Sequence, residues 1–167
     1  MPRKAGLVTF NEYFDTFVPA SKQVGQMQTL LENLYKQETT FGETDFSALC
    51  GHLGKHVNKR SFLVLYTNFS NMTSLNRQLV YLQQLARQHR VLVVFFEDVD
   101  LKEYIAGKSA TTEEYYRHVI AEKFAFEKRL IVSTLKQHGI YSLLTTPDKL
   151  SIDVINKYLE MKSRQLL

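Results

Sequence analysis

The sequence contains little of what marks a secreted, membrane-spanning or disordered protein. A single cysteine, Cys50, excludes an internal disulfide and fits a reducing compartment. Three prolines and seven glycines in 167 residues argue against long disordered linkers. The longest purely apolar run, residues 91–96, is far too short to span a bilayer, and the opening MPRKAGLVTF is not a secretory signal. With 44% hydrophobic and 23% charged residues, the composition predicts one soluble cytoplasmic domain with a core.

The short motifs of common enzymes are also missing. Ser47 lacks the Gly-x-Ser-x-Gly elbow of a nucleophile, and no glycine-rich loop could cradle a phosphate. His52 and His56 have the i, i+4 spacing of metal ligands, but no glutamate lies between them and no third ligand is evident. Two surface histidines are the better interpretation. Cys50 falls on the apolar face of the same predicted helix, as a small buried hydrophobe would.

Two apolar runs without alternation indicate the fold class. Residues 62–66 (FLVLY) and 91–96 (VLVVFF) suit strands that are buried on both faces of a parallel sheet. Strand and helix patterns alternate from residue 61 to the end, which is typical of right-handed crossovers between parallel strands. The predicted fold class is α/β, with a doubly wound, mostly parallel sheet flanked by helices, in a single domain over residues 1–167.

The other elements follow from periodicity and capping signals. Before residue 61, the pattern predicts a strand over 4–10, a hairpin or edge strand over 13–18 closed by Pro19, a helix from Ser21, and a helix capped by Thr44 or Asp45. After it, we expect helices capped by Thr73 or Ser74, by the capping box Thr111-x-x-Glu114 and by Ser151, a connection over 101–110, and a strand over 140–144 preceded by Gly139.

The long helix from Thr111 has an expected inward face and an expected exposed face. Its segment EKFAFEKR alternates in charge sign, which indicates an exposed surface with salt bridges. Phe126 lies off the main apolar stripe, where it either extends a protein-binding patch or packs internally. The inward face is predicted to consist of Tyr116, Val119, Ile120, Phe124, Leu130, Ile131 and Leu135.

Polar residues follow the predicted strands where each one ends. Thr67 and Asn68 follow one buried strand, and Glu97 and Asp98 follow the next. In open α/β sheets, ligands bind beyond the carboxyl ends of the strands. These residues therefore form a candidate interaction rim, although solubility of a sheet edge explains them equally well.

Three longer stretches resemble a known bacterial family. They are RSFLVLYTNFS, LVYLQQLARQHRVLVVFFED and AEKFAFEKRLIVSTLKQHGIYSLLTTPDKLSIDVINKYLEMK, and the opening GLVTFNEYFDTFVPAS adds to them. They resemble the C-terminal portion of the family called domain of unknown function 58, which is related to the von Willebrand factor A domain. The resemblance covers nearly the whole chain and implies a doubly wound sheet with a degenerate metal ion-dependent adhesion site at its carboxyl edge.

The resemblance implies particular metal ligands. It places Thr44 at the family's loop threonine, with Asp45 beside it, and Asn68 where an aspartate is expected. Oxygen ligands of this kind suit Mg²⁺. The family's Asp-x-Ser-x-Ser motif does not occur in the chain, and the strand and helix that carry it would precede residue 4. We therefore expect an N-terminally shortened domain, in which either the neighbouring strands pair directly or the sheet has a gap.

The leading functional hypothesis is a non-enzymatic protein-interaction domain. The resemblance implies a MoxR-type AAA+ ATPase as partner, in complex assembly, with the inner membrane reached through a longer parent protein or through the partner. The alternative is a metal-dependent hydrolase that uses Asp45, Glu97 or Asp98. A third hypothesis is nucleic-acid binding, although a solvated face explains the basic residues better. These residues are Arg77, Arg87, His89 and Arg90.

Overall fold

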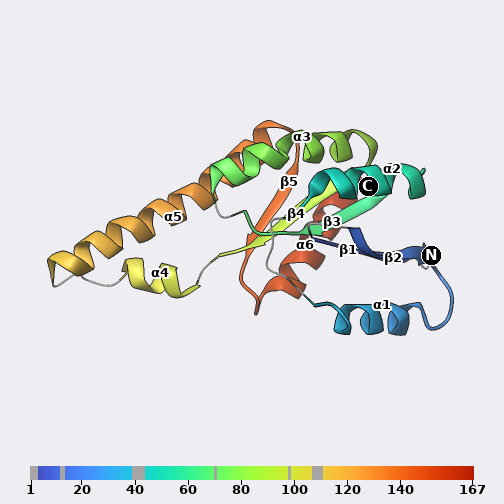
Figure 1. Cartoon of the computed structure of the whole chain (residues 1–167), viewed down its shortest axis with the longest axis horizontal. Helices are drawn as coiled ribbons and strands as arrows, with labels where there is room; N and C mark the ends of the chain where they lie inside the picture. Colours follow the sequence, from blue (N-terminus) through green and yellow to red (C-terminus); the bar gives the residue numbers. More distant parts are fainter. Residues whose placement is uncertain (1–3, 12–13, 39–43, 70, 98, 107–110) are drawn as a thin grey trace. The chain divides into compact units, whose positions relative to one another are not determined.

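The computed structural model describes residues 4–11, 14–38, 44–69, 71–97, 99–106 and 111–167. The chain forms two compact units, Met1–Asn58 and Lys59–Leu167, and each is described by itself. The first unit holds β1 (Ala5–Phe10), β2 (Phe14–Ser21), α1 (Gln26–Tyr35) and α2 (Phe46–His56). The second holds β3 (Phe62–Tyr66), α3 (Met72–Gln88), β4 (Arg90–Phe96), α4 (Val99–Ala106), α5 (Thr112–Gln137), β5 (Tyr141–Thr145) and α6 (Leu150–Ser163) (Figure 1).

The N-terminal unit opens with an antiparallel hairpin. β1 and β2 pair with Val8 opposite Phe17, which confirms the predicted hairpin. β2 continues through Pro19 rather than ending there. The Ser21 hydroxyl accepts the Gln23 N–H at 3.1 Å, and α1 begins only after Gly25, which has a φ of 90°. The prediction that Ser21 caps this helix was therefore wrong. The apolar side chains of α1, which periodicity would place inward, are exposed: Met27, Leu31, Leu34 and Tyr35.

Helix α2 supplies the core of the N-terminal unit. Asp45 caps it, as predicted, because its carboxylate accepts the backbone N–H groups of Ser47 and Ala48 at 2.7 and 3.3 Å. The Phe46 ring meets the Phe10 ring edge-on at a centroid distance of 5.4 Å. The buried side chains are Phe46, Leu49, Cys50 and Leu53, which share one face of the helix, and Cys50 was predicted to be among them.

The C-terminal unit contains a three-stranded parallel sheet in the order β3-β4-β5, flanked by helices. Leu63 pairs with Val91, and Val94 pairs with Leu143. β4 lies in the middle, and residues 91–95 are all buried, as the unbroken apolar run predicts. The α/β class is thus observed in this unit, as a short parallel sheet with helical connections.

Strand β3 is less buried than its sequence predicts. Leu65 is the one buried residue of β3, and Tyr66 is 53% exposed. In its sheet, β3 pairs along one edge only, with β4. The prediction of burial on both faces was wrong for β3, because an edge strand has neighbours on one side alone.

Helices α4 and α5 form a hairpin that extends beyond the sheet (Figure 1). The capping box of Thr111 and Glu114 is present, as predicted. α4 occupies a segment that the sequence indicated only as a connection. The Tyr104 hydroxyl donates to the Glu114 carbonyl at 3.2 Å, which ties α4 to α5. Five of the seven residues predicted to face inward on α5 are exposed, namely Tyr116, Val119, Ile120, Phe124 and Leu130.

Of the remaining helix ends, one was predicted correctly and two were not. Gly139 has a φ of 71°, the left-handed conformation expected after α5. Asn71 caps α3 in place of Thr73 or Ser74, by accepting the Ser74 N–H at 2.9 Å. The N-cap of α6 is Lys149, two residues before the predicted cap Ser151. Within the described ranges, no helix has the length and apolar character needed to cross a membrane.

Candidate functional site

The carboxyl edge of the β3-β4-β5 sheet carries the rim residues of the C-terminal unit. The Thr67 N–H donates to the Val94 carbonyl at 3.1 Å, and the Glu97 N–H donates to the Thr145 carbonyl at 2.9 Å. These bonds continue the ladders just past the ends of β3 and β4, so Thr67 and Glu97 are held at neighbouring strand ends. Asn68 is exposed beside Thr67. Asp98, the last predicted rim residue, lies outside the described residues.

The side chain of Lys128, on α5, forms hydrogen bonds at this edge of the sheet. Its ammonium donates to Asn68 Oδ1 and, at 3.0 Å, to the Phe69 carbonyl. The Nζ atom also lies 5.7 Å from the centroid of the Phe95 ring, where a cation is attracted to the aromatic face. The amide oxygen that the resemblance assigns to Mg²⁺ is therefore an acceptor for a lysine. A divalent ion at Asn68 would meet a positive charge.

The other two predicted metal ligands, Thr44 and Asp45, belong to the N-terminal unit. The Asp45 N–H donates to the Asn11 carbonyl at 2.8 Å, and its carboxylate caps α2. Asp45 thus has a structural role in its own unit. Among the residues that the structure describes, no group of three or more His, Cys, Asp or Glu side chains is arranged to hold a metal ion.

His52 and His56 stack on each other instead of converging on a point. Their ring centroids are 4.0 Å apart with an interplanar angle of 12°, and Phe17 meets the His52 ring at 4.9 Å. The His56 Nδ1–H donates to the His52 carbonyl at 3.0 Å. Burial, followed by the positive charges of His56 and Lys55, lowers the pKa of His52. Both rings also contact Phe17 of β2, while His56 is exposed and His52 is half-buried.

Cys50 and His89 are both interior residues. Burial, with a smaller contribution from the negative charge of Asp45, raises the pKa of the Cys50 thiol to about 11, so the thiol is protonated at neutral pH. This agrees with a small buried hydrophobe. His89 is 2% exposed, and the Arg90 Nε donates to the Leu166 carbonyl at 2.6 Å. The predicted basic cluster is therefore not one continuous surface.

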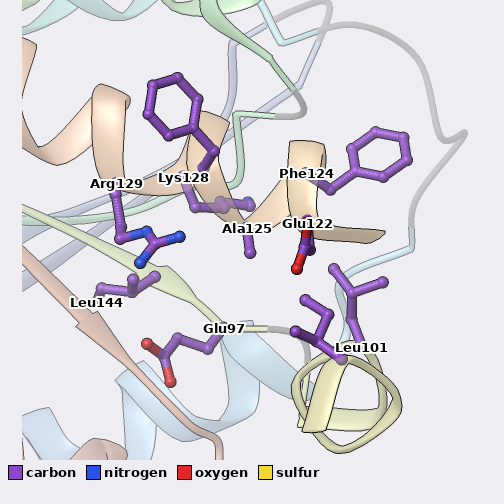
Figure 2. A pocket seen from close by; sticks show the side chains of 10 residues that line it. Glu97, Leu101, Glu122, Phe124, Ala125, Lys128, Arg129 and Leu144 are labelled. Atoms are coloured by element: carbon purple, nitrogen blue, oxygen red, sulfur yellow. The ribbon is translucent and has the colours of Figure 1, made fainter. Parts of the chain in front are cut away.

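A cavity of about 930 Å³ adjoins the rim (Figure 2). α5 and α4 form its walls, and Glu97 and Leu144 lie at its sheet side, at the ends of β4 and β5. Figure 2 shows the Arg129 guanidinium directed into this space and Leu101 on the opposite wall. The lining residues are Glu97, Leu101, Ile105, Glu122, Phe124, Ala125, Phe126, Lys128, Arg129 and Leu144.

Of the predicted rim residues that the structure describes, Glu97 lines the cavity. The sequence interpretation missed Lys128 and Arg129, although both belong to the segment EKFAFEKR. The available signal was the pair of aromatic residues inside that charged segment, which is unusual for a solvated surface. The arrangement combines apolar walls with two cations and two carboxylates, which suits binding of a chain segment or ligand with mixed polarity.

Comparison of the chain with family models, with curated proteins and with solved structures finds no match. The likeness to domain of unknown function 58 therefore stays a hypothesis, and the functional argument depends on the geometry of this site.

Proposed function

We propose that the chain is a non-enzymatic protein-interaction domain that binds its partner at the carboxyl edge of the β3-β4-β5 sheet. The observation that carries the proposal is the cavity beside the rim, with apolar walls and with Lys128 at its polar end. An exposed edge with a concave apolar surface and a few placed charges is typical of a binding site. The von Willebrand A-like fold is part of this proposal.

Lys128 gives the proposed site its chemistry. In the fold that the sequence resembles, a metal ion receives a carboxylate from the partner. Here the Lys128 ammonium lies beside Asn68, and it can donate a charge-assisted hydrogen bond to a partner's carboxylate. We therefore expect binding that does not require Mg²⁺. Coordination of Mg²⁺ by Thr44, Asp45 and Asn68 is the competing version of the proposal.

The partner that we propose is a MoxR-type AAA+ ATPase, in complex assembly. This choice derives from the sequence resemblance, as does access to the inner membrane through a longer parent protein or the partner. A cytoplasmic location agrees with the single cysteine, which is buried.

The experiment is a binding measurement between the full chain and the MoxR-type ATPase of the same genome, with millimolar Mg²⁺ or with EDTA. We expect the same affinity in both buffers and a loss of about tenfold or more for Lys128→Met. Lys136→Met, another lysine on α5 that lies away from the rim, is the matched control and should bind normally. Binding that EDTA abolishes would favour the metal site, and no binding in either buffer would refute the proposed partner.

The hydrolase alternative involves Asp45, Glu97 and Asp98. Glu97 lines the cavity, whereas Asp45 caps α2 and Asp98 lies outside the described residues. Turnover in an esterase and phosphatase screen that Glu97→Gln abolishes would favour hydrolysis over binding.

A further inference from the structure

Helix α5 is apolar on two different faces. Ala121, Ile131 and Leu135 are buried against the C-terminal unit. Seven other large apolar side chains of α5 are exposed: Tyr115, Ile120 and Phe124 are spread around the helix, and four share one arc, namely Tyr116 (66%), Val119 (44%), Phe126 (59%) and Leu130 (39%). At about 100° per residue, these four are confined to an arc of about 80°, centred about 140° from the buried set. We call these four residues the outer stripe.

An exposed apolar stripe of this kind is normally buried against another surface. A surface helix normally has one apolar face and one polar face, and a helix that is apolar on opposite sides is normally buried on both. The outer stripe has the spacing of a helix-pairing seam, with Tyr116 and Leu130 at one heptad position and Val119 and Phe126 at the other. The complementary surface is therefore another helix.

We infer that the outer stripe binds a second copy of this chain, with the two α5 helices antiparallel about a twofold axis. In this arrangement Val119 packs against the partner's Leu130, and the symmetry repeats the contact. Lys123 lies within the stripe, between Val119 and Phe126. In the dimer it faces the partner's Phe126, and its ammonium forms a cation–π contact with that ring. One polar residue within an apolar seam selects a single register.

The charges beside the outer stripe favour a second copy in the antiparallel direction. Glu122 and Arg129 lie on the same flank, seven residues apart. Antiparallel pairing places Glu122 opposite the partner's Arg129, and the twofold axis produces this ion pair twice. Parallel pairing would place Glu122 opposite the partner's Glu127 and would repel. The charge pattern of one α5 helix is thus complementary to that of a second α5 helix that runs in the opposite direction.

Both charged groups are accessible for this pairing. The Glu122 side chain is 60% exposed, and its contact within the chain, with His118 Nε2, is long at 3.6 Å. Arg129 is exposed, and across the described ranges it makes no ion pair. Arg117, by contrast, already pairs with Glu113 at 2.6 Å on the same helix. Glu122, Phe126 and Arg129 also line the cavity, so the second copy lies against it.

The inference is tested by sedimentation equilibrium of the full chain across the micromolar range. We expect a monomer–dimer equilibrium that Phe126→Asp weakens by at least about tenfold. Glu122→Arg alone and Arg129→Glu alone should each weaken it by about tenfold, since each sets like charges opposite each other. The double variant Glu122→Arg/Arg129→Glu should restore the wild-type constant, because the pair is re-formed with its signs exchanged.

Arg117→Glu is the matched control, since Arg117 lies on α5 away from the outer stripe, and it should dimerise like the wild type. All the substituted side chains are exposed, and circular dichroism confirms that each variant retains its helices. A monomer throughout the concentration range would overturn the inference. So would a dimer that Phe126→Asp leaves intact, or a double variant as weak as the single ones. Binding of the monomer to anionic phospholipid vesicles, lost in Phe126→Asp, would assign the stripe to a membrane surface instead.

The inference goes beyond the proposed function, and the two can fail separately. A monomeric chain that binds the ATPase would overturn the dimer alone. A dimer that binds no ATPase would leave the α5 pairing in place, and it would refute the proposed partner if the Val119→Asp monomer, in which no second copy covers the cavity, also binds none.

Discussion

At the scale of single residues, Asp45 has two competing roles, as a helix cap and as a metal ligand. Its carboxylate accepts two backbone N–H groups at the start of α2. Asparagine caps helices about as well as aspartate, whereas alanine cannot cap. A metal ligand responds differently, because the amide of asparagine lacks the negative charge that binds a divalent ion.

We therefore expect Asp45→Asn to leave the free energy of unfolding nearly unchanged, and Asp45→Ala to lower it by about 0.5–2 kcal/mol. Urea unfolding with and without millimolar Mg²⁺ measures both effects. If Mg²⁺ stabilises the wild type and Asp45→Asn removes that stabilisation, Asp45 is a metal ligand and the capping role is not its only one.

His89 makes the stability of the protein depend on pH. Burial lowers its pKa below the ordinary value of 6.5. Its Nδ1 accepts the Ser61 N–H at 3.3 Å, and within the described part of the chain its buried Nε2 has no partner. The neutral ring is the form that fits this environment.

Because the folded pKa of His89 lies below the unfolded pKa, the unfolded chain binds more protons in acid. The contribution of His89 is thus complete above pH 6.5 and is lost as the pH falls towards the folded pKa. Urea unfolding at several pH values should show this loss, and His89→Gln, which does not titrate, should reduce it. His138→Gln, which replaces an exposed histidine, is the control. An equal pH dependence in wild type and His89→Gln would contradict the assignment.

At the scale of elements, the sequence predicted what depends on neighbours along the chain. The capping box at Thr111, the cap at Asp45 and the left-handed Gly139 are all present, because each involves residues within one turn. The buried strand β4 was predicted correctly as well, since six consecutive apolar residues, 91–96, leave few alternatives. Most of the helix starts that failed, at α1, α3 and α6, offered several possible caps close together.

Which faces of α5 and β3 are buried could not be predicted from neighbours along the chain. Periodicity shows which residues of α5 share a face, but not how far the helix extends beyond the sheet that would cover that face. Helix α5 extends beyond the sheet (Figure 1), and Tyr116 and Val119 in its first half are exposed. The run in β3 is as apolar as that in β4, yet β3 lies at the sheet edge, and strand order is not encoded in one strand's composition.

At the scale of the whole molecule, the two units differ in the size of their cores. The N-terminal unit buries Phe46, Leu49, Cys50 and Leu53, whereas the C-terminal unit contains the buried strand β4 and most of the other buried apolar side chains. Stability rises with the fraction of apolar surface that a chain buries, and chains of about 60 residues are marginal.

We expect residues 59–167 produced alone to fold, with a cooperative thermal transition and the far-ultraviolet spectrum of a helical protein with some sheet. Residues 1–58 alone should lack such a transition. Circular dichroism of the two pieces measures this difference. Unfolded residues 59–167 would show that their core depends on the N-terminal unit.

The sequence by itself determined the α/β class, the central buried strand and the caps of α2 and α5, because these depend on composition and on contacts within a few residues. It also located polar groups at the strand ends. Only the tertiary structure decided that Lys128 donates to Asn68, that α4 and α5 enclose a cavity with Glu97, and that α5 has an uncovered stripe. These features join residues that are up to 60 positions apart in the chain. Such distances are set by how the elements pack, and no local pattern encodes them.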